Sequence, residues 1–228
     1  MRFTVSGRCG KLLTTLLAGG LGNLLALLST SLISTQPQIA FDLSHLVTFA
    51  VAIYFGPYYG LLAGATVAIY PYVKFGVLGA YGPWVGLSII VGKAMTGLVC
   101  GVLARRMRPY LAIPLSFIPE SLFTLAFLKA VQVWMLPDTL TWNMISDILI
   151  KGWVEVLIMS FILETVTRRH VIETAVLLLE IFIITLLVHK EGTHTLALLL
   201  VIVFVIMITI DLIGQYRSKD KKDASGFN

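Results

Sequence analysis

The sequence predicts an all-α membrane protein, built as a polytopic helix bundle, and three observations lead to this fold class. Of the 228 residues, 57% are hydrophobic and only 13% are charged, whereas about a quarter of the residues in soluble domains carry a charge. The mean hydropathy of +0.91 leaves too few polar side chains to cover a soluble body. Uncharged stretches also recur along the chain, and they reach the length of about 20 residues that a helix needs to cross a bilayer.

The first predicted span covers residues 11–33, and a polar, proline-bearing link follows at 34–41. The next uncharged stretch, 43–73, is too long for one crossing. It contains Gly56-Pro57, and a proline inside a helix removes a backbone hydrogen bond. We therefore expect two short spans joined by a turn at this point, the second of them ending at Pro71.

Five more apolar stretches follow, which brings the predicted count to eight spans with short connections. The first six spans form a predicted domain at 1–170, and the last two form a hairpin at 171–214. A short polar tail at 215–228 is expected to be cytoplasmic and disordered. The five later spans are predicted at 83–104, 112–134, 143–165, 172–188 and 194–214.

The basic residues test this count, because each additional crossing moves every later loop to the other side of the membrane. With eight spans and both termini cytoplasmic, only Lys74 and Lys190 fall on the outer side. The net charge of +5 is then explained by orientation in the bilayer rather than by nucleic-acid binding, with a docking surface for a cytoplasmic partner as the alternative. The cytoplasmic cations are Arg2, Arg8, Lys11, Arg105, Arg106, Arg108, Arg168, Arg169, Arg217, Lys219, Lys221 and Lys222.

The sequence offers no recognisable catalytic or metal-binding equipment. It contains no nucleotide-binding glycine loop, nucleophile elbow or HExxH motif, so we expect no enzymatic activity and no cofactor. The two cysteines, Cys9 and Cys100, lack metal-ligand spacing, and neither a zinc site nor a disulfide framework is expected.

Charged residues inside the spans are the strongest functional signal, because such groups face a protein interior or a wet cavity rather than lipid. Asp147, Lys151 and Glu155 recur every four positions and so share one helical face. This stripe is either a salt-bridge ladder that fixes helix packing or the polar wall of a substrate site. Lys93 lies in the fourth span, and Glu120 and Lys129 lie in the fifth.

Residues near the predicted outer side add to this hypothesis. Tyr72, Trp84 and Asn143 lie on the same side as Lys129, although aromatic residues also form belts at membrane interfaces. His45 either contacts a ligand or helps to cap the second span. The predicted substrate-binding residues are Lys93, Lys129, Asp147, Lys151, Glu155, His45, Tyr72, Trp84 and Asn143.

Small residues recur every four positions on the first span, at Ala18, Gly22 and Ala26. Such a face lets another helix backbone approach closely. It serves either packing within this chain or docking onto a different membrane subunit.

Residues 41–64 resemble the substrate-binding S components of energy-coupling-factor (ECF) vitamin transporters. The resemblance is carried by FDLSHL at 41–46, AVAIYF at 50–55 and GPYYGLLAG at 56–64. The small-residue face of the first span is similar to the coupling motif of that family. The resemblance covers roughly residues 11–170, and the last two spans depart from it.

This resemblance implies a six-helix S-component fold that binds a vitamin or related micronutrient from outside, in the outer half of the bundle. It also implies that Ala18, Gly22 and Ala26 face a membrane coupling subunit, which in turn carries two ATPase subunits. We accordingly expect a multi-pass protein of the plasma membrane of a prokaryote. The alternatives are a stand-alone proton-coupled carrier and a membrane scaffold that transports nothing.

Overall fold

The computed structural model describes residues 7–32, 42–79, 82–136 and 140–168. The two C-terminal spans predicted at 172–188 and 194–214, and the tail after them, lie outside the described residues. The count of eight spans and the side of each terminus therefore stay predictions.

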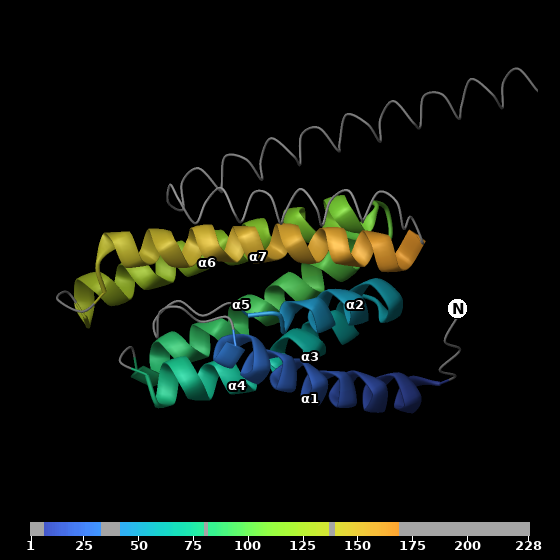
Figure 1. Ribbon diagram of the computed structural model, residues 1–228, viewed down its shortest axis with the longest axis horizontal. Coiled ribbons are helices and arrows are strands. Elements are labelled where there is room, and N and C mark those ends of the chain that lie inside the picture. The colour runs from blue at the N-terminus through green and yellow to red at the C-terminus, as the bar shows by residue number, and fades with distance from the viewer. Residues whose placement is uncertain (1–6, 33–41, 80–81, 137–139, 169–228) are drawn as a thin grey trace, which may run out of the picture. The chain divides into compact units, whose positions relative to one another are not determined.

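The described chain is all helical, which confirms the all-α part of the predicted fold class (Figure 1). Four helical stretches in it are long and apolar enough to cross a membrane, and they indicate a membrane-embedded protein: Arg8–Ser31, Pro57–Val77, Gly82–Leu103 and Pro109–Trp134. The elements in order are α1 (Arg8–Leu32), α2 (His45–Phe55), α3 (Pro57–Val67), α4 (Ile69–Pro71), the π-helical turn η1 (Tyr72–Val77), α5 (Gly82–Leu103), α6 (Pro109–Trp134) and α7 (Trp142–Arg168).

The predicted turn at Gly56-Pro57 is present, and it separates α2 from α3. Gly56 has φ +99°, a left-handed conformation that favours glycine, and Pro57 occupies the first turn of α3, where its missing N–H leaves no bond unmade. With 11 residues, α2 is only about 16 Å long, which is roughly half of the hydrocarbon thickness. The helix α2 therefore begins near the middle of the bundle rather than at its surface.

The prediction that the third span ends at Pro71 is wrong, because the chain stays helical through α4 and η1. The interruption falls instead at Ala68, between α3 and α4. Asn23 of α1 occupies this break: its side-chain amide donates to the Thr66 carbonyl at 2.8 Å and accepts from the Tyr70 N–H at 2.6 Å. These two backbone groups would bond each other in a regular helix, so Asn23 replaces the lost bond.

The small residues of α1 pack inside the chain. A methyl group added at Gly22 would meet Val67 and Val47, and Ala26 is completely buried. Gly22 and Ala26 thus make contacts of intra-chain packing, the alternative that the sequence also allowed, and docking of a partner at Ala18, Gly22 and Ala26 stays a prediction. The exposed side of α1 carries leucines instead, namely Leu12, Leu13, Leu16, Leu17, Leu21, Leu24, Leu27 and Leu28.

Glycines also bring α3 and α5 together. A Cβ atom at Gly60 would collide with the Gly97 carbonyl, and one at Gly64 would collide with the Lys93 carbonyl. The two backbones are thus in direct contact, the arrangement that small residues favour between membrane helices. This contact fixes the level of Lys93 relative to α3.

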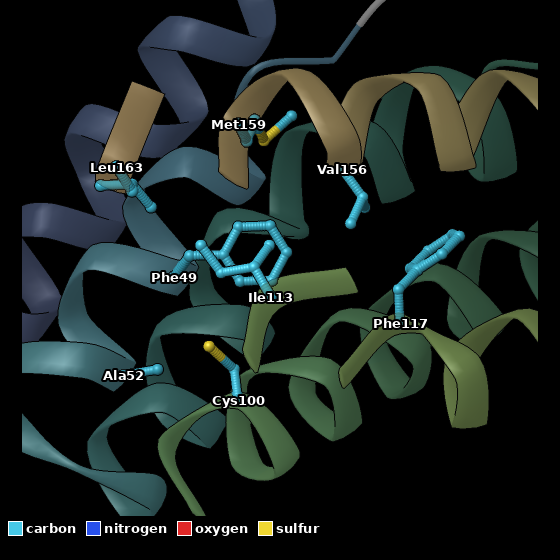
Figure 2. Packing of buried hydrophobic residues seen from close by; sticks show 8 residues of the cluster. All are labelled: Phe49, Ala52, Cys100, Ile113, Phe117, Val156, Met159 and Leu163. Carbon is cyan, nitrogen blue, oxygen red and sulfur yellow. The ribbon is translucent and has the colours of Figure 1, made fainter. Parts of the chain in front are cut away.

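An apolar cluster joins α2, α5, α6 and α7 (Figure 2). Phe49 and Ile113 are fully buried at its centre, and Met159 of α7 lies against them. A second cluster near the α6–α7 connection contains Val85, Leu128 and Ile145, among others.

Candidate functional site

A cavity of about 160 Å³ lies between these two apolar clusters. Phe117 and Val156 belong both to its wall and to the first cluster, and Val85 and Leu128 belong both to its wall and to the second. All the ionisable residues in its wall come from the start of α2 and from α5, α6 and α7. They are Asp42, His45, Lys93, Glu120, Lys151 and Glu155.

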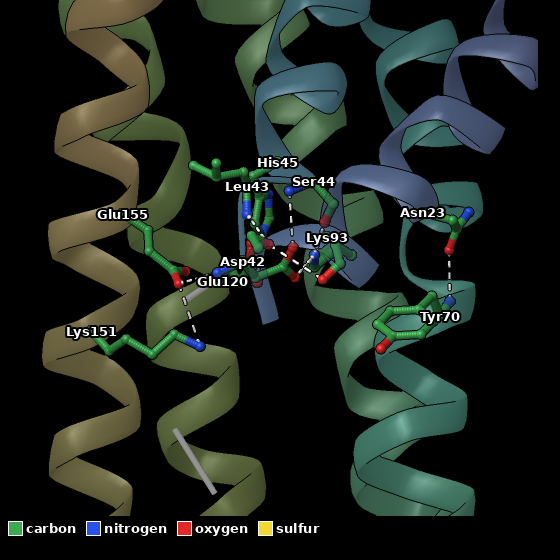
Figure 3. A network of polar contacts seen from close by, with 12 residues as sticks. Asn23, Asp42, Leu43, Ser44, His45, Tyr70, Lys93, Glu120, Lys151 and Glu155 are labelled. Carbon is green, nitrogen blue, oxygen red and sulfur yellow. Dashed lines mark hydrogen bonds and ion pairs between the residues drawn. The ribbon is translucent and has the colours of Figure 1, made fainter. Parts of the chain in front are cut away.

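Lys93 holds the start of α2 in place (Figure 3). Its ammonium group lies 2.5 Å from the Asp42 carboxylate and 2.5 Å from the Ser44 hydroxyl. The side chains of Lys93 and Asp42 are only 4% and 9% exposed. A buried charge of either sign requires such a partner, because its desolvation costs several kcal/mol.

The backbone that precedes α2 is satisfied by side chains in the same network. The Asp42 N–H donates to Glu155 at 2.6 Å, and the Ser44 N–H donates to the Asp42 carboxylate at 2.9 Å. Non-helical backbone within a membrane is tolerated only where protein or trapped water satisfies it. Asp42 and Glu155 thus allow the chain to begin a helix in the interior of the bundle.

Lys151 forms the most accessible part of the ionisable wall. Its ammonium group lies 3.4 Å from Glu155, four residues further along α7. The Lys151 side chain is 25% exposed, compared with 5% for Glu155. The Lys151–Glu155 pair is therefore the weaker and more solvent-exposed of the two lysine–carboxylate pairs around the cavity.

Glu120 has the smallest set of partners among the buried carboxyls. It accepts a hydrogen bond from the Thr96 hydroxyl, and Gly92 leaves the space that its side chain occupies. The nearest ring nitrogen of His45 lies 3.8 Å from Glu120, which is too far for a hydrogen bond. His45 stacks on Phe49, and its Nδ1 atom is buried without a hydrogen-bond partner.

The rest of the wall is apolar apart from the hydroxyl residues Ser88 and Thr124. Phe117 lies edge-on to Trp153 with ring centroids 5.2 Å apart, and Phe75 is contributed by η1. Ile148 and Leu149 of α7 complete this surface. A cavity of roughly 150 Å³ accepts a benzene ring, so the site has room for one ring with a short substituent, enclosed by apolar groups with a few fixed polar atoms.

The structure brings together His45, Lys93, Lys151 and Glu155 of the predicted substrate-binding residues, all of which line the cavity. Lys129 does not: it is exposed, lies 4.5 Å from the centre of the Trp142 ring and donates to Gln132.

Asp147 is half-buried on α7, outside the cavity wall, so the expected stripe of three charges reduces to the Lys151–Glu155 pair. Trp84 and Asn143 are exposed, and Tyr72 is half-buried beside Gly86; none of these three lines the cavity. Their aromatic or polar character fits an interfacial position, which was the alternative for the outer residues.

Two central residues were absent from the predicted set. Asp42 precedes the apolar run of α2 and so carried no signal as an intramembrane charge, although its neighbour His45 was considered. Glu120 did carry that signal, but it stood apart from the stripe on α7. Only the fold reveals that both face Lys93 and His45.

Within the described parts of the chain, no group of three or more His, Cys, Asp and Glu residues is arranged to hold a metal ion. The polar groups form hydrogen bonds and ion pairs that can be made and broken reversibly.

No protein-family model, curated protein or solved structure matches this chain.

Proposed function

We propose that this protein is the substrate-capture subunit of an ATP-driven importer of a vitamin-type micronutrient. The observation that carries the proposal is a cavity of about 160 Å³, lined by six ionisable residues, inside a bundle of apolar helices. Ionisable side chains inside a membrane protein mark substrate and ion pathways, because the free-energy cost of removing them from water is otherwise not compensated. In the proposed mechanism, the solute enters from outside, and ATP hydrolysis on partner subunits drives its release.

The position of the cavity supports capture from outside. On the topology inferred from the basic residues, α5 and α7 begin at the outer side. The wall residues Val85, Ser88 and Ile148 lie in the first turns of these helices, ahead of Lys93 and Glu155. The cavity then extends from the middle of the bundle toward the outer side.

The proposed partners are a membrane coupling subunit and two ATPase subunits in the plasma membrane of a prokaryote. Their docking site requires a surface beyond Gly22 and Ala26, which are buried. The exposed leucines of α1 and the exposed Arg105 and Arg106 after α5 are surfaces that such partners would find accessible.

Native mass spectrometry of the protein, extracted gently from its own membrane, tests this proposal. A retained small molecule together with an ATPase pair is the expected result. A protein that carries neither solute nor companion subunits would contradict the proposal and favour a scaffold.

A stand-alone proton-coupled carrier is the second candidate, because Glu120 and His45 form a buried acid–base couple without a hydrogen bond between them. Uptake into liposomes that contain only this protein, driven by a pH gradient, would favour the carrier over the importer subunit.

A further inference from the structure

We propose that the solute is a small organic cation: one ring bearing an amine, amidine or similar N–H group that donates to Glu120. This inference rests on the proposed function, since it names the chemical class that the same cavity accepts. It follows from three features of the wall, which are its charge, its unused polar atoms and its size.

The charged groups of the wall are unequal in number. Three carboxyl groups, those of Asp42, Glu120 and Glu155, face two lysines, Lys93 and Lys151. With neutral His45 and all three carboxyls ionised, the sum is one negative charge, which a proton on a carboxyl or a bound cation would balance, because an uncompensated charge is strongly disfavoured in a buried site. A monocation restores neutrality.

The excess negative charge is located at Glu120. Lys93 donates to Asp42 and Ser44, and Lys151 pairs with Glu155. Glu120 receives only the Thr96 hydroxyl, which bonds its Oε2 atom. Its other oxygen, Oε1, has no hydrogen bond among the described residues and is the free acceptor for a charged N–H donor.

His45 lies beside Glu120 and also carries a nitrogen that has no hydrogen bond among the described residues. Its Nδ1 is buried and has no hydrogen-bond partner, which is unusual for a polar atom in a native interior. The other ring nitrogen, Nε2, is the one that lies near the free acceptor, 3.8 Å from Glu120 Oε1.

The lysines, in contrast, leave little attraction for an anion. Lys93, Lys129 and Lys151, all predicted to bind substrate, would together favour an anionic or zwitterionic ligand. In the structure Lys129 lies outside the wall, and the other two already face carboxylates.

The size of the cavity, close to the roughly 150 Å³ that holds benzene, limits the ligand to about one ring.

Three probes of nearly identical shape test the charge of the ligand: benzamidine is a cation, benzamide is neutral and benzoate is an anion. Their binding to the full chain in lipid nanodiscs is measured by isothermal titration calorimetry. We expect benzamidine to bind at least about tenfold more tightly than either of the others, as a charge-assisted hydrogen bond predicts. Equal binding of the three, or a preference for benzoate, would overturn the inference, and this ranking needs no variant.

Two matched variants locate the preference. Glu120→Gln is expected to abolish the advantage of benzamidine, whereas Asp147→Asn, the same change at a carboxyl outside the wall, is expected to keep it. Retention of the preference in Glu120→Gln would overturn the assignment to Glu120.

Native mass spectrometry separates failure of this inference from failure of the proposed function. A retained cationic solute supports both. If the chain retains a neutral or anionic solute, or if no probe binds although a solute is retained, the inference falls and the importer proposal stands. Absence of both solute and companion subunits overturns the proposed function itself.

Discussion

Lys93 and Glu120 are both buried in the wall of the same cavity, yet their surroundings differ. Lys93 has a carboxylate and a hydroxyl at 2.5 Å, and both come from the residues that begin α2. Glu120 has one hydroxyl partner and a histidine nitrogen at 3.8 Å. The first arrangement pairs the buried charge with an opposite charge and a hydroxyl, whereas the second leaves one carboxyl oxygen without a hydrogen bond among the described residues.

This difference separates two roles for buried polar groups. A fully paired group specifies where α2 starts, because breaking the pair leaves a charge in the interior. An incompletely paired group is available to a ligand. Substitutions at the two residues should therefore affect different properties: stability at Lys93, and ligand binding at Glu120.

The largest effect on stability is expected for Lys93→Met, which leaves the buried Asp42 carboxylate without its cation. The free energy of unfolding should fall by about 3–5 kcal/mol, measured by reversible denaturant unfolding in detergent micelles. Adding Asp42→Asn to this variant should recover most of the loss, since neither member of the pair then carries a charge. Lys129→Met, at an exposed lysine, is the control and should be nearly neutral. An equal loss in both lysine variants would show that the Asp42 pair is not the cause.

A smaller loss is expected for Ser44→Ala, because Lys93 keeps Asp42 and loses only the hydroxyl. A hydrogen bond to a charged group contributes about 1.5–3 kcal/mol, so the same unfolding measurement should place this variant between Lys93→Met and the unaltered protein. Ser121→Ala, which removes a hydroxyl that bonds only its own helix in an exposed position, is the matched control. A loss as large as that of Lys93→Met would mean that Ser44 rather than Asp42 holds the lysine.

The smallest effect on stability is expected for Glu120→Gln. The amide has the shape of the carboxyl and can still accept from the Thr96 hydroxyl, and no ion pair at hydrogen-bonding distance is lost. The free energy of unfolding should change by less than about 1 kcal/mol. A loss comparable to that of Lys93→Met would assign Glu120 a structural role and remove the contrast between the two residues.

The helices were largely predictable because apolar length and a Gly-Pro break are local signals. The break at Ala68 was not, since it depends on Asn23, a residue of α1 that is distant in the chain. Pro71 was a misleading signal. It lies three residues after the break, in the first turn of the next helical segment, where the backbone N–H that proline lacks would have no partner within the helix.

The site was only partly predictable for a related reason. Lys93, Lys151 and Glu155 stand out as charges within apolar runs, and all three line the cavity. Periodicity groups Asp147 with Lys151 and Glu155, but it does not tell where along the helix the cavity ends. Asp42 became visible only through its contacts with Lys93 and Glu155, which lie 51 and 113 residues away in the sequence.

The same ambiguity affected the small residues of α1. Their spacing predicts close approach of another helix, and a single sequence does not reveal whether that helix belongs to the same chain. The contacts of Gly22 with Val67 and Val47 answer the question for this residue.

The most direct test of the account is whether a solute occupies the cavity at Glu120. Native mass spectrometry of the unaltered protein, Glu120→Gln and Asp147→Asn, each extracted in the same way, measures retention of the endogenous small molecule. We predict that the unaltered protein and Asp147→Asn retain it and that Glu120→Gln releases it while remaining folded. Undiminished retention by Glu120→Gln, or no bound solute in any of the three proteins, would contradict the account.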